Sequence, residues 1–101
     1  MLNINQSIQD NIVTIELEGR LNNVSAPMLQ AAVDESIGEA AAFVFDFKKL
    51  EYLSSAGLRI LLTTQQTMEE TGRPDVTVQG ANATIKGVFA VTGFDNDLNI
   101  K

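Results

Sequence analysis

Two adjacent serines stand just before a predicted helix, in the segment Ser54-Ser55-Ala56-Gly57-Leu58. A serine hydroxyl at a helix start can accept a hydrogen bond from a backbone N–H two or three residues further on. We interpret Ser55 as the N-cap of this helix, which is a structural role. The same position suits a second chemistry, because a phosphate on an exposed serine there would face free N–H groups and the positive end of the helix dipole. From the residues alone, both roles stay open.

Asp46 is the second candidate, at the end of a strand predicted over residues 42–47. Ligands of open α/β sheets gather beyond the carboxyl ends of the strands, so we expect Asp46 and Ser55 at the same end of the sheet. The favoured interpretation is structural: the Asp46 carboxylate accepts hydrogen bonds from the N–H groups of the following loop and organises that loop. Without a histidine, no general acid and base pair is predicted around it.

The chain contains neither cysteine nor histidine. This excludes thiolate nucleophiles, disulfides, Cys/His zinc sites and Ser-His pairs. Gly-rich phosphate-binding signatures are also missing from the sequence. We therefore predict a protein that is not an enzyme and that needs no cofactor or metal ion. A small nucleotide-binding protein, using a helix N-terminus in a crevice beside Asp46 and Ser55, stays open as an alternative.

The chain has 101 residues, of which 45% are hydrophobic, and a net charge of −6. Its length and composition predict a single globular domain over residues 1–101. The excess of acidic residues argues against direct contact with nucleic acid or with an anionic membrane surface. No signal peptide or membrane-spanning stretch is recognisable, so we expect a cytoplasmic protein without membrane insertion.

Hydrophobic periodicity predicts the elements that position these residues. Alternating residues over 3–8 and 12–18 indicate an antiparallel hairpin that ends at Gly19. A helix follows, opened by Ser25 and Pro27, with Ser or Asn as its cap. The remaining predictions are a strand over 42–47, a loop over 48–55, a helix over 56–71, a strand around Val76 and Val78, a helix from Asn82 to Gly93, and an extended piece around Leu98 and Ile100.

The order of these elements predicts an α/β fold. The nearly continuous apolar run over 42–47 suits a strand that is covered on both faces. The helix before it supplies the crossover that parallel strands require. We predict a small mixed sheet of four to five strands, an N-terminal antiparallel hairpin followed by parallel crossovers, with about three helices packed against it in the order ββαβαβα(β).

Residues 45–62, Phe-Asp-Phe-Lys-Lys-Leu-Glu-Tyr-Leu-Ser-Ser-Ala-Gly-Leu-Arg-Ile-Leu-Leu, resemble the central signature of STAS domains, as found in bacterial anti-sigma factor antagonists. Three flanking pieces match in the expected order: Ile15-x-Leu17-x-Gly19-x-Leu21, Ser25-Ala26-Pro27-x-Leu29, and Val91-Thr92-Gly93-Phe94-Asp95-x-x-Leu98-x-Ile100. The resemblance covers essentially the whole chain and agrees with the fold predicted above.

The resemblance implies partner switching. The unphosphorylated antagonist binds an anti-sigma factor that is also a serine kinase, which frees the sigma factor. The kinase phosphorylates one serine at the start of the second helix and so releases the antagonist, and a phosphatase resets the switch. In this sequence the acceptor position is Ser55, with Ser54 as the alternative. We expect the free protein to be a monomer or a weak dimer.

Two positions depart from the family pattern, because Ser54 and Asn22 stand where typical members carry Asp. We expect the partner to bind over residues 53–62 and nearby edges. The predicted partner-binding residues are Leu53, Ser54, Ser55, Ala56, Gly57, Leu58, Arg59 and Asn22. A second hypothesis for the same domain is a regulatory subunit of a membrane transport or lipid-transport complex.

Overall fold

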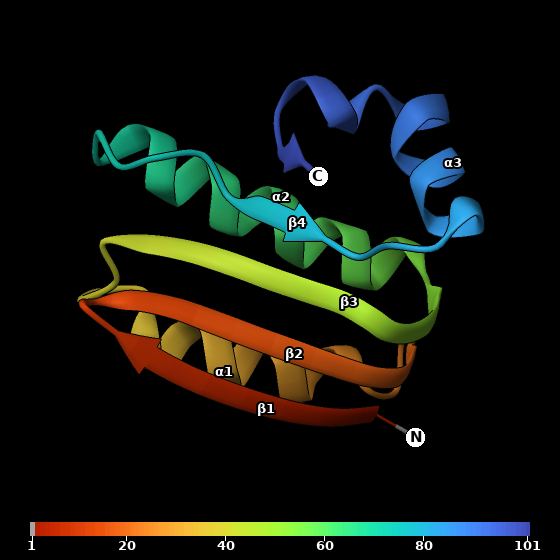
Figure 1. Cartoon of the computed structure of the whole chain (residues 1–101), viewed down its shortest axis with the longest axis horizontal. Coiled ribbons are helices and arrows are strands. Elements are labelled where there is room, and N and C mark those ends of the chain that lie inside the picture. The colour runs from red at the N-terminus through yellow and green to blue at the C-terminus, as the bar shows by residue number, and fades with distance from the viewer. Residues whose placement is uncertain (1) are drawn as a thin grey trace.

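The computed structural model describes residues 2–101, which form one five-stranded sheet and three α-helices (Figure 1). The strands are β1 (Leu2–Gln9), β2 (Ile12–Leu21), β3 (Ala42–Leu53), β4 (Thr77–Gln79) and β5 (Asn99–Ile100). The helices are α1 (Ala26–Ser36), α2 (Ser55–Glu70) and α3 (Ala83–Thr92), with a short 3-10 helix η1 (Phe94–Asn96) before β5.

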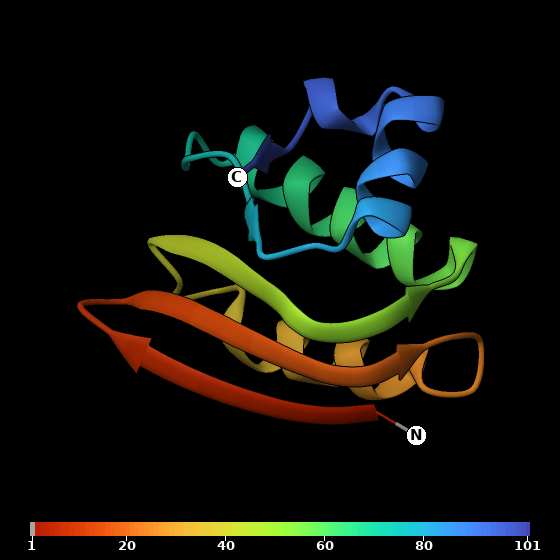
Figure 2. The ribbon, with the colours of Figure 1, turned by 45° about the vertical axis from the view of Figure 1, so that its right-hand side comes forward.

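The strands are arranged in their sequence order, β1-β2-β3-β4-β5, with β1 antiparallel to β2 and every other pair parallel. This confirms the predicted α/β fold and its element order. Each parallel connection moves one strand further along the sheet, so right-handed crossovers place the helices on one face. Helices α1 and α2 lie together behind the sheet, and α3 follows the end of β4 (Figures 1 and 2).

The core lies between the sheet and the helices. Phe43, Phe45 and Phe47 of β3 are fully buried there, with successive ring centroids 6.1 and 6.3 Å apart. The prediction that β3 is covered on both faces holds only in part, because the helices cover one face, and on the other face Asp46 is buried while Val44 is half-buried. The phenylalanines occupy alternate positions and therefore share one face. The other face of β1 to β3 carries exposed polar side chains such as Asn5 and Glu16.

Strands β2 and β3 are both longer than predicted. β2 continues through Gly19, whose φ of 107° suits glycine at a register shift, and ends at Leu21. Its final residues pair with the segment 49–53, which therefore extends β3 through most of the predicted loop. Phe47 and Lys48 together lie opposite Leu17 in a β-bulge, because Glu16 pairs with Asp46 whereas Glu18 pairs with Lys49.

The predicted ends of α3 are confirmed. The Asn82 Oδ1 atom accepts a hydrogen bond from the Ile85 N–H at 2.9 Å, as an N-cap does. At the other end Gly93 takes the left-handed conformation, with φ of 77°, and the helix stops there.

Arg73 joins the segment after α2 to the end of α1. Its Nη1 atom donates to the carbonyl oxygens of Ile37 and Ala40 at 2.6 and 2.7 Å, and its Nε atom donates to the Thr71 hydroxyl at 2.8 Å.

We expect Arg73→Lys to lower the free energy of unfolding by about 1–3 kcal/mol, because lysine cannot reproduce the planar guanidinium that donates to all three acceptors. Urea denaturation measures the loss. Arg59→Lys is the control: Arg59 is exposed and its side chain forms no hydrogen bond within residues 2–101, so its change should stay within about 0.5 kcal/mol. Equal losses in both variants would contradict this role.

Candidate functional site

The candidate site begins at the junction of β3 and α2, where a single residue, Ser54, separates strand from helix. Ser54 has an extended backbone, with φ −87° and ψ 171°, and its Oγ accepts from the Gly57 N–H at 3.4 Å. Its carbonyl also accepts from the Leu58 N–H at 3.0 Å. The prediction that Ser55 is the N-cap is therefore wrong. The cap is the residue that keeps an extended backbone just outside the helix, and here that residue is Ser54.

Ser55 is the first helical residue of α2, and it is exposed. Its hydroxyl makes no hydrogen bond within the described part of the chain, residues 2–101. The two serines are thus separated by role: Ser54 is half-buried and bonded to the helix, whereas Ser55 presents a free hydroxyl to solvent. Modification of Ser55 would leave the helix cap in place.

The loop between β2 and α1 lies directly against this junction. The Ser54 N–H donates to the Leu21 carbonyl at 2.9 Å, and Leu21 pairs with Leu53 in the parallel register. Asn22 organises the loop, since its Oδ1 atom accepts from the N–H groups of Val24 and Ser25 at 3.0 and 3.1 Å. An asparagine side chain can make the same backbone contacts as an aspartate in such a turn. Asn22 therefore keeps the loop ordered without a carboxylate.

Ser25 stands at the N-cap position of α1, but its side chain makes no capping bond to that helix. Its hydroxyl instead donates to the Arg20 carbonyl at 2.9 Å and accepts from the Asn22 N–H at 2.9 Å. Of the two residue types predicted to cap α1, Ser or Asn, the serine at the cap position therefore makes no capping hydrogen bond. The serine closes the loop beside α2 instead.

Gly57 allows α2 to begin against this loop. A Cβ atom at position 57 would lie 2.6 Å from Cγ and Cδ2 of Leu21 and 2.9 Å from Cδ1 of Leu53. Leu21 is completely buried, so it has no free space into which to move. The close contact fixes the first turn of α2, and with it Ser55, relative to β2.

The residues predicted to bind a partner do not share one level of exposure. Leu53, Gly57 and Leu58 are buried, so they support the exposed residues of the site and are not themselves open to a partner. The remaining members reach the surface: Ser55 and Arg59 are exposed, and Asn22, Ser54 and Ala56 are half-buried. The burial of the first group follows from β3 running on to Leu53 and from the contact of α2 with Leu21.

Two exposed apolar residues near the loop were not among the predicted binding residues. Val24 is 88% exposed and follows Asn22 in the β2–α1 loop, and Met28 on the first turn of α1 is 53% exposed. A valine between Asn23 and Ser25, in a segment of polar turn residues, is a signal that the sequence contained. Apolar side chains in such a position add to a surface that a protein partner can cover.

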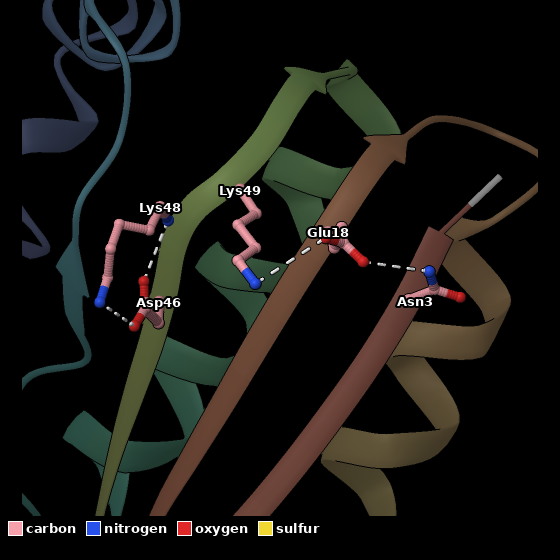
Figure 3. A network of polar contacts seen from close by, with 5 residues as sticks. All are labelled: Asn3, Glu18, Asp46, Lys48 and Lys49. Carbon is pink, nitrogen blue, oxygen red and sulfur yellow. Dashed lines mark hydrogen bonds and ion pairs between the residues drawn. The ribbon is translucent and has the colours of Figure 1, made fainter.

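Asp46 lies elsewhere, in the middle of β3, opposite Glu16 and Gln79 (Figure 3). The expectation that it stands at a strand end beside Ser55 is wrong, because β3 continues to Leu53. At about 3.3 Å per strand residue, Asp46 and Leu53 are roughly 20 Å apart. The hollow lined by Asp46 within residues 2–101 does not include Ser55, so the nucleotide-binding alternative lacks the shared crevice on which it depended.

The Asp46 carboxylate organises the β-bulge in β3. Its Oδ1 atom accepts from the Lys48 N–H at 3.0 Å, and its Oδ2 atom lies 3.7 Å from the Lys48 Nζ atom. Figure 3 shows the neighbouring contacts, in which Glu18 lies between Lys49 and Asn3. The Lys49 and Glu18 side chains are largely exposed, and surface pairs of this kind contribute little to stability. The Asp46 side chain is largely buried, whereas that of Lys48 is exposed. Asp46 thus accepts one backbone N–H within a bulge, whereas the prediction had it accept several in a loop.

Within residues 2–101, no group of three or more Asp or Glu side chains is placed to hold a metal ion. None of the helices described there has the length and apolar character needed to cross a membrane.

Comparison with known proteins places this fold and site in a family. Residues 4–100 match the family model described as "Mlab, STAS domain". The chain belongs to the STAS domain family. The predicted resemblance is confirmed, and the STAS match spans nearly all of the residues that form the sheet and helices.

Solved structures share the STAS fold at low sequence identity. The chain is similar to an anti-sigma factor antagonist from Mycobacterium paratuberculosis, with 22% identity, a TM-score of 0.88, and coverage of 99% of this chain and 85% of that one. It is similar to the Bacillus cell fate determinant SpoIIAA in its phosphorylated form, with 18% identity, a TM-score of 0.79, and coverage of 98% and 91%. It is also similar to a sulfate transporter family protein from Wolinella succinogenes, with 16% identity, a TM-score of 0.76, and coverage of 93% and 79%. No curated protein sequence matches this STAS domain.

Removing the cap of α2 tests the assignment of roles to the two serines. We expect Ser54→Ala to lower the free energy of unfolding by about 0.5–1 kcal/mol, the low end of the range for N-caps, because its bond to Gly57 is long. Asn82→Ala should cost more, since the Asn82 bond at the start of α3 is 2.9 Å. Ser55→Ala should stay within about 0.5 kcal/mol. Thermal and urea denaturation give the ranking, and a larger loss for Ser55→Ala than for Ser54→Ala would contradict it.

Proposed function

We propose that this STAS-domain protein is an anti-sigma factor antagonist that switches partners through phosphorylation of Ser55. The observation that carries the proposal is the free, exposed hydroxyl of Ser55 on the first turn of α2, beside a neighbouring serine that already forms the cap. A kinase can reach Ser55 without disturbing the helix. The protein acts as a binding module and supplies no catalytic group of its own.

Phosphorylation changes the surface more than it changes the fold. A phosphate adds about −1.5 to −2 charge at neutral pH. The positive end of the α2 dipole tolerates that charge, so the domain stays folded. A partner pressed against Ser55, Arg59 and the β2–α1 loop would meet a new dianion in the middle of its contact surface. Binding is therefore lost through repulsion and blocked fit.

The proposed partner is an anti-sigma factor that is also a serine kinase, and a phosphatase reverses the modification. Several structural neighbours are named anti-sigma factor antagonists, and one is named in its phosphorylated form. Control of transcription through a protein partner also agrees with the net charge of −6, which disfavours direct contact with nucleic acid.

A regulatory subunit of a membrane transport complex is the second candidate. The observation that favours it is the similarity to the sulfate transporter family protein from Wolinella succinogenes. In that case the same loop and helix would bind a transport protein, and Ser55 would carry no phosphate.

Purification of the protein from its native cells separates the two candidates. Under the first, the co-purifying protein phosphorylates the chain when ATP is added, and intact-mass and peptide analysis place one phosphate on Ser55. Under the second, a transport protein co-purifies and the mass stays that of the unmodified chain. A native protein that carries phosphate only at other residues would overturn the assignment of Ser55.

A further inference from the structure

Strand β1 forms an unprotected edge of the sheet. It pairs with β2 through an uninterrupted register from Leu2 opposite Gly19 to Gln9 opposite Ile12. On its other side no strand lies within residues 2–101. Alternate residues of an edge strand direct their N–H and C=O groups outward, where a further strand can bind them.

The two edges of this sheet differ in how they avoid such pairing. The far edge is β5, which has only two residues and is too short to act as a template. β1 has eight residues, Leu-Asn-Ile-Asn-Gln-Ser-Ile-Gln, with no charged residue and no proline. Its pairing also shows no register shift, so no bulge twists the edge away. Each of the usual protections of an exposed edge is missing from β1.

The side chains of β1 are suited to contact with a second strand. Ile4 and Ile8 point to the helix-covered face, and Ile8 is 61% exposed, which is high for a residue on that face. Between them Gln6 donates to the Ser36 hydroxyl of α1. The opposite face carries Asn5 and Ser7, both small and polar. The edge is therefore neutral on both faces in a chain whose net charge is −6.

We propose that β1 pairs antiparallel with β1 of a second copy of this chain, about a two-fold axis at Gln6. An antiparallel strand pair can be symmetric, so one neutral strand serves both copies. With Gln6 opposite its own counterpart, Ile4 faces Ile8 of the second copy, and Asn5 faces Ser7. This register keeps the helix faces of both sheets on one side, covers Ile8, and joins the two sheets into one of ten strands.

Charge near the contact determines how the dimer responds to salt. Glu35 and Glu39 line a small hollow together with Ile8, so each copy brings carboxylates close to the shared edge. Their mutual repulsion is screened by salt. Backbone hydrogen bonds and the buried isoleucines stabilise the dimer, and salt does not weaken them. Because salt screens the repulsion between the carboxylates, the dissociation constant should fall as salt is added. An association driven by opposite charges would become weaker.

Cysteine crosslinking tests the register, since the chain has no cysteine of its own. In a Gln6→Cys variant the two introduced thiols face each other across the axis, at a Cα separation that suits a disulfide. An Asn3→Cys variant is the matched control on the same strand, because Asn3 faces Gln9 of the second copy and its own counterpart lies roughly 20 Å away. Mild oxidation should crosslink the first variant and leave the second monomeric. Equal crosslinking of both, or of neither, would overturn the register.

Sedimentation tests the contact in the unmodified chain. The weight-average mass should rise from monomer toward dimer with concentration, and further at higher salt. Ile8→Glu should raise the dissociation constant at least about tenfold, because it removes an apolar contact and adds a carboxylate beside Glu35 and Glu39 in each copy. Val91→Glu is the control, since Val91 is 88% exposed but lies on α3, and it should associate as the parent does. A parent chain that stays monomeric throughout, or one whose β1 edge binds only a different protein, would overturn the proposal.

Discussion

Under the proposed function, replacing Ser55 with alanine should abolish phosphorylation by the proposed kinase while leaving binding to it intact. Ser55 is exposed at the first position of α2, and its hydroxyl makes no hydrogen bond to another residue within 2–101. Alanine removes the phosphate acceptor without removing a structural contact. The measurement is phosphate incorporation from ATP into purified protein, together with affinity for the partner by titration calorimetry.

The charge-bearing substitution should have the opposite effect on binding. Ser55→Asp places a carboxylate where the phosphate would stand, and we expect affinity to fall by about tenfold or more, since unfavourable charge contacts at an interface cost several kcal/mol. Thermal stability should be unchanged or slightly higher, because a negative charge is favourable at a helix N-terminus.

Ser54→Ala is the matched control for both measurements. It removes the cap hydroxyl and leaves the acceptor in place, so the kinase should still phosphorylate it. If the kinase phosphorylated Ser55→Ala fully and no longer phosphorylated Ser54→Ala, the acceptor would be Ser54 and not Ser55.

Replacing Gly57 with valine should produce a large loss of stability. The new Cβ would fall 2.6 Å from Leu21, and the two added methyl groups would enter the space between Leu21 and Leu53. Both leucines are buried, so the strain cannot be relieved by a rotation into solvent. We expect a loss of about 3 kcal/mol, at the upper end for overpacking, and a fall in Tm of roughly 4–8 °C for each kcal/mol.

A double-mutant cycle shows whether Leu21 is the cause of that loss. Leu21→Ala alone should cost about 2–5 kcal/mol by leaving a cavity. In the Leu21→Ala background the cavity receives the valine, so the double variant should lose clearly less than the sum of the two single losses. Gly87→Val is the control, because nothing lies within 4 Å of a Cβ at that helical glycine. If the losses of the two single variants were strictly additive, or if Gly87→Val lost as much stability as Gly57→Val, the contact with Leu21 would not be the reason that position 57 requires glycine.

Local patterns were sufficient for much of the fold. Alternation placed the β1–β2 hairpin, the Asn82 cap and Gly93 bounded α3, and the helix between two predicted strands required a parallel crossover. These features are decided by neighbours in sequence, within one turn of helix or one hairpin. They are therefore visible without knowledge of the fold.

Three of the errors lie where distant segments meet. The length of β3 is set by pairing of its residues 49–53 with the last residues of β2, and no pattern within 48–55 reveals a partner about thirty residues earlier. Because β3 ends at Leu53, the cap moves to Ser54, Ser55 becomes free, and Asp46 moves from a strand end to the middle of the sheet. One long-range pairing thus accounts for all three corrections.

The sequence by itself determined the chemistry available to this protein and its family. Without cysteine or histidine the chain lacks thiolate and imidazole chemistry, and the motif around the two serines before Gly57 is typical of STAS domains. Only the tertiary structure decided which serine hydroxyl is free of hydrogen bonds and which buried side chains pack under the first turn of α2. The reason is physical: exposure and capping depend on where β3 ends and on how closely α2 packs against Leu21, and both are contacts between residues far apart in the chain.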